Sequence, residues 1–176
     1  MSLNSALSMA TVTHLTVDEY LRRHDEPVCE LIAGGPVAKP VGTIEHMKME
    51  RRLQQLLEPF EQRGLGQVVW ELSFRQRDEV RIPDVVFLAS TARFEDGILV
   101  DAPSLCIEIL SPSQRETELF AKCQVYDAWG VPYCWVIDPI GKKAWESHQG
   151  APVPLSVVDG FLRAGEIVVS VGKLFE

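Results

Sequence analysis

The stretch "LCIEILSPS", residues 105–113, decides the fold class of this 176-residue chain. In an extended conformation, leucine and isoleucine at positions 105, 107 and 109 point to one side, and Glu108 lies between a cysteine and a leucine on the other. Apolar residues on both sides are typical of a central strand in an α/β sheet. The glutamate in the middle of this strand is therefore the first candidate functional residue.

Helices are predicted before and after this strand. Residues 113–130 form a helical segment that ends at Gly130, and "VPYCWVIDP" (131–139) follows as a second buried strand. Strand, helix and strand in this order predict a right-handed crossover between parallel strands. A longer helix is predicted over 43–63 from apolar residues at helical spacing, and a short helix begins after the capping residue Thr16.

The remaining segments are predicted to be strands. Residues 28–40 form a strand, a glycine turn and a return strand, and residues 66–77 and 81–90 form one strand each. We expect an α/β fold in which the two main helices flank a mixed central sheet. The chain should form a single domain over residues 1–176, in which the N-terminal ~10 residues are flexible.

Composition narrows the range of functions. The chain is 46% hydrophobic and 24% charged, which is enough apolar content for one compact domain with a buried core. Its formal net charge of −8 argues against a general nucleic-acid coat protein or a membrane-surface binder, because both carry basic blocks. This charge still allows an enzyme that contacts DNA through a local basic rim.

Cysteine spacing and hydropathy bear on the redox state and the location of the protein. The four cysteines stand singly, at positions 29, 106, 123 and 134, without the close spacing of a zinc or redox motif, so we expect reduced core cysteines. No apolar run is long enough to span a membrane, and the N-terminus lacks the pattern of a signal peptide. The sequence therefore predicts a cytoplasmic protein with no membrane partner.

A second carboxylate, Asp84 in "RIPDVVFL" (81–88), shares its strand face with apolar residues in the same way as Glu108. Burying one unpaired ionised carboxylate costs several kcal/mol, and a domain has only about 5–15 kcal/mol of stability. The two groups must therefore be protonated, paired with cations or bound to a metal. Either one alone also has a structural explanation, Asp84 as a turn cap and Glu108 as the partner of an arginine.

Lys122 is the cation that the sequence offers to these acids. On a helical wheel it falls inside the apolar arc, between Tyr126 and Trp129, where a solvated lysine would not lie. Alternatively, it pairs with Glu118 one turn earlier or extends from the edge of the interface.

Two further polar residues lie among apolar ones. His46 shares a helical face with core residues of the 43–63 helix, and Glu30 occupies the centre of "VCELIAG". Each also has an ordinary interpretation, as a hydrogen-bonded core histidine and as a glutamate on an exposed face. Both remain possible additional site residues.

These motifs resemble a large bacterial family of predicted restriction endonucleases, long catalogued as a domain of unknown function, within the PD-(D/E)XK nuclease superfamily. The resemblance runs from "VCELIAGG" to "VIDP", and its most specific part is the segment that begins with "EILSPS" and ends with "YDAWGVPYCWVIDP". Pro83 and Asp84 match the proline-aspartate element, and Glu108 matches the second acid. Leu110 stands where the superfamily has its lysine, but this family places that lysine in the following helix, at the position of Lys122.

The resemblance implies a restriction-endonuclease-like fold and Mg²⁺-dependent hydrolysis of DNA phosphodiester bonds. Asp84 and Glu108 would bind Mg²⁺ or Mn²⁺ as hard oxygen ligands, and Lys122 would orient the attacking water or stabilise charge on the phosphate. Glu30 and His46 match further acidic and histidine positions of the family. The alternative is a protein that retains the nuclease fold for non-catalytic DNA binding or for assembly.

DNA contacts and assembly complete the expectations. A groove should open over the acid pair, with Lys48, Arg51 and Arg115 on its rim, because an acidic protein must offset its own field where phosphate approaches. Apolar residues in the C-terminal strands, and the two-fold symmetry common among related nucleases, predict a homodimer.

Overall fold

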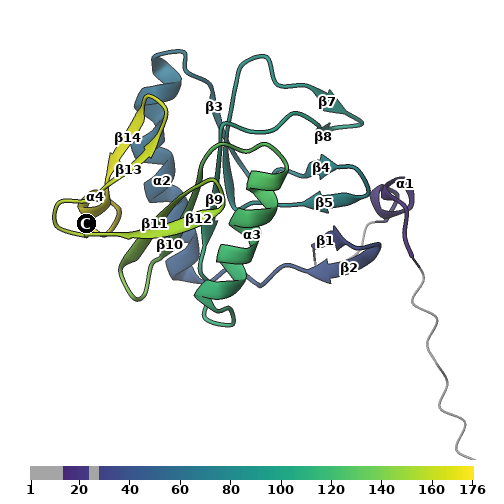
Figure 1. Ribbon diagram of the computed structural model, residues 1–176, viewed down its shortest axis with the longest axis horizontal. Helices are drawn as coiled ribbons and strands as arrows, with labels where there is room; N and C mark the ends of the chain where they lie inside the picture. Colours follow the sequence, from purple (N-terminus) through teal and green to yellow (C-terminus); the bar gives the residue numbers. More distant parts are fainter. Residues whose placement is uncertain (1–13, 24–27) are drawn as a thin grey trace, which may run out of the picture.

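The computed structural model of the protein describes residues 14–23 and 28–176, so the predicted flexibility of the N-terminal ~10 residues lies outside the described residues. The centre is a six-stranded mixed sheet in the order β12-β11-β10-β9-β6-β3 (Figure 1). Strands β9 and β10 are parallel, as predicted, and the other neighbours are antiparallel. The strands are β3 (Gln67–Trp70), β6 (Val85–Leu88), β9 (Leu105–Ile109), β10 (Cys134–Asp138), β11 (Lys143–His148) and β12 (Ala151–Leu155).

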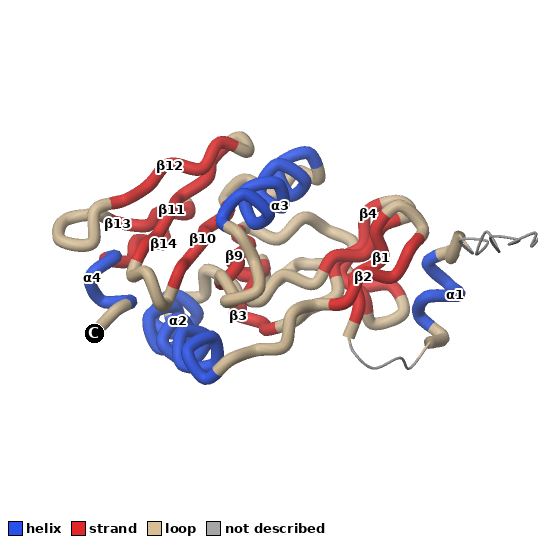
Figure 2. The backbone as a smooth tube through the Cα atoms, turned by 90° about the horizontal axis from the view of Figure 1, so that it is seen from below, coloured by secondary structure: helices blue, strands red, loops and turns tan. Residues whose placement is uncertain are grey.

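A second six-stranded sheet, in the order β2-β1-β5-β4-β8-β7, lies at one end of the central sheet (Figure 2). It includes the predicted hairpin at residues 28–40, whose strands pair in antiparallel register. Its strands are β1 (Cys29–Ile32), β2 (Gly35–Ala38), β4 (Phe74–Gln76), β5 (Glu79–Arg81), β7 (Phe94–Glu95) and β8 (Ile98–Leu99).

A bent hairpin joins the two sheets. One arm passes from β3 into β4 and the other from β5 into β6, so each arm belongs to both sheets. The sequence predicted one unbroken strand for each arm, but the first breaks at Glu71, whose φ is 46°, and the second breaks at Asp84. The Glu71 N–H donates to the Asp84 carbonyl oxygen at 3.1 Å. Asp84 therefore lies at the junction of the sheets and not within a regular strand.

The two main helices cover opposite faces of the central sheet (Figure 2). Helix α2 (Ile44–Gln62) begins after the N-cap Thr43 and packs Leu53 and its apolar neighbours against one face. Helix α3 (Glu116–Ala128) packs Leu119, Cys123 and Tyr126 against the other face. Both elements were predicted, and the resulting sandwich confirms the predicted fold class.

The remaining elements enclose these layers. Helix α1 (Val17–Leu21) has the predicted capping box between Thr16 and Glu19. The hairpin of β13 (Phe161–Ala164) and β14 (Ile167–Ser170) and the short helix α4 (Val171–Leu174) add apolar side chains to the core beneath α2. Cys106, Cys123 and Cys134 are buried, as predicted, whereas Cys29 is partly exposed. Within the described ranges, no helix is long and apolar enough to cross a membrane.

Candidate active site

Glu108 projects from β9 towards α3 and is only 2% exposed. Its Oε1 atom accepts a hydrogen bond from the Tyr126 hydroxyl at 2.5 Å, and its Oε2 atom accepts one from Lys122 Nζ at 3.0 Å. Burial raises the pKa of Glu108. The charge of Lys122 opposes this rise, and the charges of Asp84 and Glu30 add to it. The buried carboxylate predicted from the sequence is therefore real, and it is held by two donors from one helix.

Lys122 bridges two acids. Its ammonium group lies 3.0 Å from Glu108 and 3.3 Å from Glu30, and its side chain is 15% exposed. Burial alone would lower the pKa of Lys122, but Glu108, Glu30 and Asp84 together raise it above its usual value. Lys122 is therefore a fixed cation. Its alternative partner, Glu118, lies beside Arg115 at 3.6 Å.

Asp84 is held from two directions. Its Oδ2 atom accepts the Ile109 backbone N–H at 2.7 Å, which ties the junction between the sheets to β9. Its Oδ1 atom lies 3.0 Å from Lys39 Nζ and 3.7 Å from His46 Nε2. Lys39 follows β2, and its ammonium group is also 3.7 Å from Glu71. Hydrogen bonds and ion pairs thus satisfy both oxygens of the second predicted acid.

His46 lies in the first turn of α2 and faces the same carboxylate. Its Nε2 atom is 3.3 Å from Glu50, one turn further along the helix. Burial alone would lower the pKa of His46, but Glu50 and Asp84 raise it above its usual value. Among the described residues, no group bonds to its Nδ1 atom.

Glu30, on β1, is 4% exposed and is joined to the site through Lys122. Its Oε1 atom also accepts the Ile82 N–H at 3.0 Å, and its Oε2 atom lies 3.8 Å from Arg81. It lines a hollow that adjoins the pocket described next and shares Lys39 and Lys122 with it. Glu30 therefore holds Lys122 in position, and it is connected to Glu108 through that lysine.

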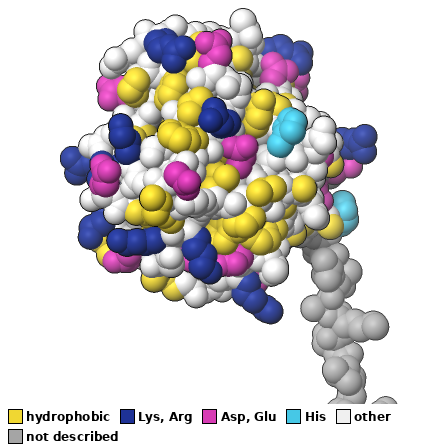
Figure 3. Space-filling model, turned by 60° about the vertical axis from the view of Figure 1, so that its left-hand side comes forward, with side chains coloured by type: hydrophobic (Ala, Val, Ile, Leu, Met, Phe, Trp, Pro, Cys, Tyr) yellow, Lys and Arg dark blue, Asp and Glu magenta, His cyan; other side chains and the backbone are white. Residues whose placement is uncertain are grey.

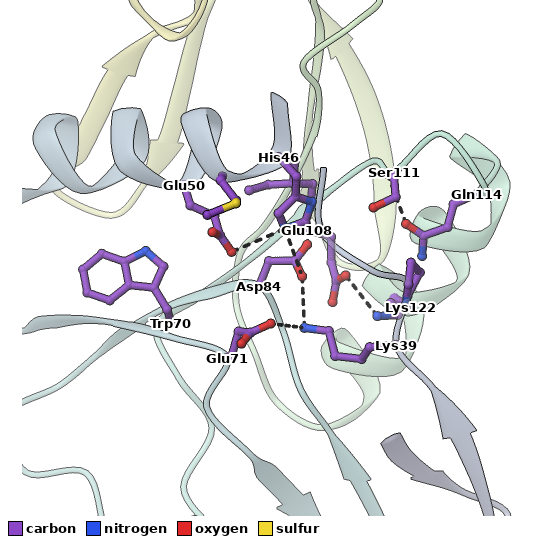
Figure 4. A pocket seen from close by; sticks show the side chains of 14 residues that line it. Lys39, His46, Glu50, Trp70, Glu71, Asp84, Glu108, Ser111, Gln114 and Lys122 are labelled. Atoms are coloured by element: carbon purple, nitrogen blue, oxygen red, sulfur yellow. Dashed lines mark hydrogen bonds and ion pairs between the residues drawn. The ribbon is translucent and has the colours of Figure 1, made fainter. Parts of the chain in front are cut away.

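The main acids open onto one pocket of about 270 Å³, at the end of the central sheet next to the second sheet (Figure 4). We call it the acid pocket. Strand β9 supplies Glu108, the junction supplies Asp84, and α2 and α3 form opposite walls with His46 and Lys122. The lining residues are Lys39, Pro40, Gly42, His46, Met47, Glu50, Trp70, Glu71, Asp84, Glu108, Ile109, Ser111, Gln114 and Lys122.

None of the three predicted rim residues lines the acid pocket itself. Lys48 and Arg51 line a second groove over α2, which shares no residue with the acid pocket. Arg115 stands at the N-cap of α3 with its side chain 86% exposed, next to Gln114 of the pocket wall. Arg115 is thus the rim candidate nearest to the acids along the chain.

Sequence reasoning missed two residues of this pocket, Lys39 and Glu50, and the hydrogen bond from Tyr126 to Glu108 behind it. Lys39 was not identified, although it is the only basic residue between Cys29 and Gly42. Tyr126 was assigned to the apolar core, and its hydroxyl bond to Glu108 depends on how α3 docks. Glu50 could have been inferred from His46, because residues four apart share a helical face.

The donor set of the acid pocket fits Mg²⁺ or Mn²⁺. Both cations prefer hard oxygen ligands, and Mg²⁺ is commonly held by one or two carboxylates while water and substrate phosphate fill the other positions. Asp84 and Glu108 supply two such carboxylates. In residues 14–23 and 28–176, no cluster of three or more His, Cys, Asp or Glu side chains is arranged to hold a metal. A divalent cation at this pocket therefore depends on the two acids and must compete with Lys39 and Lys122 for them.

The fold and this pocket define a restriction-endonuclease-like protein. The chain belongs to the Uma2 family, whose description is "Putative restriction endonuclease" and whose pattern matches residues 17–161. Its structure is similar to that of a "putative nuclease belonging to DUF820" from Anabaena variabilis, with a TM-score of 0.75. The two share 24% sequence identity, and the match covers 92% of this chain and 97% of the other, which shows a common fold. Comparison with curated proteins gave no match.

Proposed function

We propose that this protein is a Mg²⁺- or Mn²⁺-dependent endonuclease that hydrolyses phosphodiester bonds in DNA. One observation carries the proposal: Asp84 and Glu108 open onto one pocket, with the ammonium group of Lys122 3.0 Å from Glu108. Carboxylates that can hold a divalent metal, and a cation that can stabilise charge on a phosphate, are groups suited to metal-assisted phosphodiester hydrolysis. The description of the family supports nuclease activity in general.

The acids would hold the metal, and the lysines would handle the charge of the substrate. A divalent cation bound by Asp84 and Glu108 would polarise the phosphate and lower the pKa of an attacking water. Lys122 is kept in place by Glu30 and Glu108, so its N–H groups can orient that water or bond a phosphate oxygen with little reorganisation. Lys39, once released from Asp84, would be a second cation for the phosphate.

An activity panel tests this proposal. Plasmid, linear, single-stranded and branched DNA are incubated with the protein and Mg²⁺ or Mn²⁺, with and without a chelator. We expect cleavage of at least one form, loss of cleavage on chelation, and weaker cleavage as salt rises. The Glu108→Gln variant, purified in parallel, must be inactive. Equal cleavage by this variant would identify a contaminating nuclease and remove the support for the proposal.

A non-catalytic DNA-binding or assembly role is the second candidate. It is favoured by the way protein donors engage all four carboxylate oxygens of the acid pair, and by the net charge of −8. Calorimetric titration with Mn²⁺ separates the two candidates. Binding that disappears in Asp84→Ala supports the nuclease, whereas no binding at millimolar Mn²⁺ supports the non-catalytic role.

A further inference from the structure

A second groove lies between α2 on one side and α4 and the β10–β11 turn on the other, and four cations line it. We call it the basic groove. Lys48, Arg51 and Arg52 come from α2, and Lys142 comes from the turn between β10 and β11. Two carboxylates, Glu45 and Glu176, also line the basic groove. The other lining residues are apolar or uncharged: Met49, Gln55, Pro139, Leu174 and Phe175.

The four cations of the basic groove are free of ion pairs. Within the described part of the chain, none of them has a carboxylate within 4.0 Å. The chain has 25 acidic and 17 basic residues, and at least seven of the other thirteen cations have a carboxylate partner. The cations with carboxylate partners are Lys39, Arg63, Arg81, Arg93, Arg115, Lys122 and Lys143. Four uncompensated cations side by side create a local positive potential on an acidic protein.

The basic groove and the acid pocket lie on neighbouring faces of the same helix. Met47 and Glu50 line the acid pocket, and Arg51 is four residues after Met47, so it lies directly beside this face. Lys48 and Arg52, again four residues apart, lie beyond Arg51. Figure 3 shows the side of the molecule that carries α2, where Lys and Arg side chains gather towards the lower edge. An extended ligand leaving the acid pocket can therefore cross α2 and enter the basic groove.

The spacing fits a nucleic-acid strand. An α-helix with its side chains is about 10–12 Å wide, and a strand of duplex DNA advances about 3.4 Å along the duplex axis per nucleotide, so a strand crosses α2 within a few nucleotides.

We propose that the basic groove binds the phosphate backbone of the substrate strand a few nucleotides from the bond held in the acid pocket. This inference rests on the proposed nuclease function for its choice of DNA, but backbone binding in the groove does not require cleavage. It gives the protein a minimum substrate length. Short oligonucleotides reach only the acid pocket, and longer ones reach both sites.

Fluorescence anisotropy in the uncleaving Glu108→Gln background tests the inference. Labelled single-stranded oligonucleotides of 4, 8 and 16 nucleotides are titrated with this protein and with a groove variant that also carries Lys48→Gln, Arg51→Gln and Arg52→Gln. A control variant carries Arg22→Gln, Arg75→Gln and Arg77→Gln instead, which changes the net charge equally on α1 and the β4–β5 hairpin. Lys142→Gln probes the groove from a separate element.

The groove variant should bind the 16-mer about 10²-fold more weakly, and the slope of log affinity against log salt should fall by about 2 for three lost phosphate contacts. The control should change affinity less than threefold, Lys142→Gln should act in the same direction as the groove variant, and the groove variant should lose less affinity for the 4-mer than for the 16-mer. Equal binding of the 16-mer by the groove and control variants overturns the inference, as does equal affinity of the parent for 4-mer and 16-mer. If groove binding is found but the wild-type protein cuts no DNA, the inference stands and the proposed nuclease function fails.

Discussion

Lys39 Nζ lies 3.0 Å from Asp84 Oδ1, and both side chains are almost fully buried, at 8% and 7% exposure. The two residues are 45 positions apart and meet only because β2 ends beside the junction of the two sheets. The ammonium group neutralises a carboxylate that the sequence leaves without a partner. It also occupies an oxygen that a divalent cation would need. Lys39 is thus a built-in competitor of the metal that we propose for this pocket.

Replacing Lys39 with methionine should lower stability and raise metal affinity. Removing one partner of a buried ion pair costs about 3–5 kcal/mol, because the remaining charge stays buried without compensation. Urea unfolding without metal should show this loss, and Mn²⁺ should restore more stability to Lys39→Met than to the wild type. Calorimetry should show tighter Mn²⁺ binding. Lys143→Met is the matched control, because Lys143 forms its ion pair with Glu116 at the surface. This variant should change neither the stability nor the Mn²⁺ affinity. Weaker Mn²⁺ binding by Lys39→Met would contradict the competition.

Asp84→Ala should abolish the binding of divalent cations. The substitution removes one of the two proposed carboxylate ligands and leaves the buried Lys39 ammonium group near the site, where it repels a cation. Calorimetric titration with Mn²⁺ measures this directly. Asp101→Ala, which removes an aspartate paired with Arg93 at the surface, should leave Mn²⁺ binding intact. Unchanged Mn²⁺ affinity in Asp84→Ala would rule out the proposed ligand.

Lys122→Met should reduce turnover about 10²-fold or more while the protein stays folded, the scale seen when one transition-state donor is lost. Methionine retains the length and the apolar part of the Lys122 side chain, which extends from α3. Steady-state cleavage kinetics should show the loss in kcat, with circular dichroism as the check on folding. Glu118→Gln, which removes the alternative partner suggested by the sequence, should have full turnover because Glu118 lies next to Arg115. Full activity of Lys122→Met would leave the lysine a structural role only.

Tyr126→Phe should destabilise the protein by about 1.5–3 kcal/mol, the value of a hydrogen bond to a charged group. Burial and the charge of Glu108 raise the pKa of Tyr126 well above its usual value, so its hydroxyl remains a donor to Glu108 at neutral pH. Chemical unfolding measures the loss. Tyr133→Phe is the matched control, because this half-buried ring stacks on His148 and should depend little on its hydroxyl. Equal stability of Tyr126→Phe and the wild type would mean that the Glu108 oxygen finds another donor.

A homodimer remains a prediction. Exposed apolar side chains persist in the C-terminal half, where Val153 on β12 is 57% exposed and Val158 is 94% exposed. Light scattering at micromolar concentration should give twice the chain mass of 19.7 kDa. Val153→Lys should shift the mass towards that of a monomer if this edge of the sheet is the contact. A monomer mass for the wild type would exclude the dimer.

The elements that could be predicted from the sequence have local, periodic causes. The alternation around Glu108 and the apolar spacing in α2 and α3 depend only on residues a few positions apart. The strand, both helices and the buried lysine could therefore be predicted. The break in the strand at Asp84 was not predicted, because the apolar run continues across it. Pro83 was the available signal, since proline cannot donate a hydrogen bond to a neighbouring strand and disfavours a regular central strand.

The pairing of charges could be predicted only in part. The sequence required cations or a metal for Asp84 and Glu108, and Lys122 was found because its place on the helix was unusual. Lys39 was not found, because its role depends on how the β1–β2 hairpin docks against the junction. No local pattern encodes contacts between elements so far apart in the chain.

The bent hairpin makes the acid pocket sensitive to partial opening of the molecule. Each arm runs through both sheets, and the Glu71–Asp84 backbone bond joins the two arms where they pass from one sheet to the other beside the pocket. The β1–β2 hairpin, by contrast, is joined to the second sheet by only one edge, through the pairing of β1 with β5. Amide exchange should therefore be faster in β1 and β2 than in β9. A transient detachment of that hairpin would withdraw Glu30 and Lys39 together, and expose the acid pair to solvent while the central sheet stays intact.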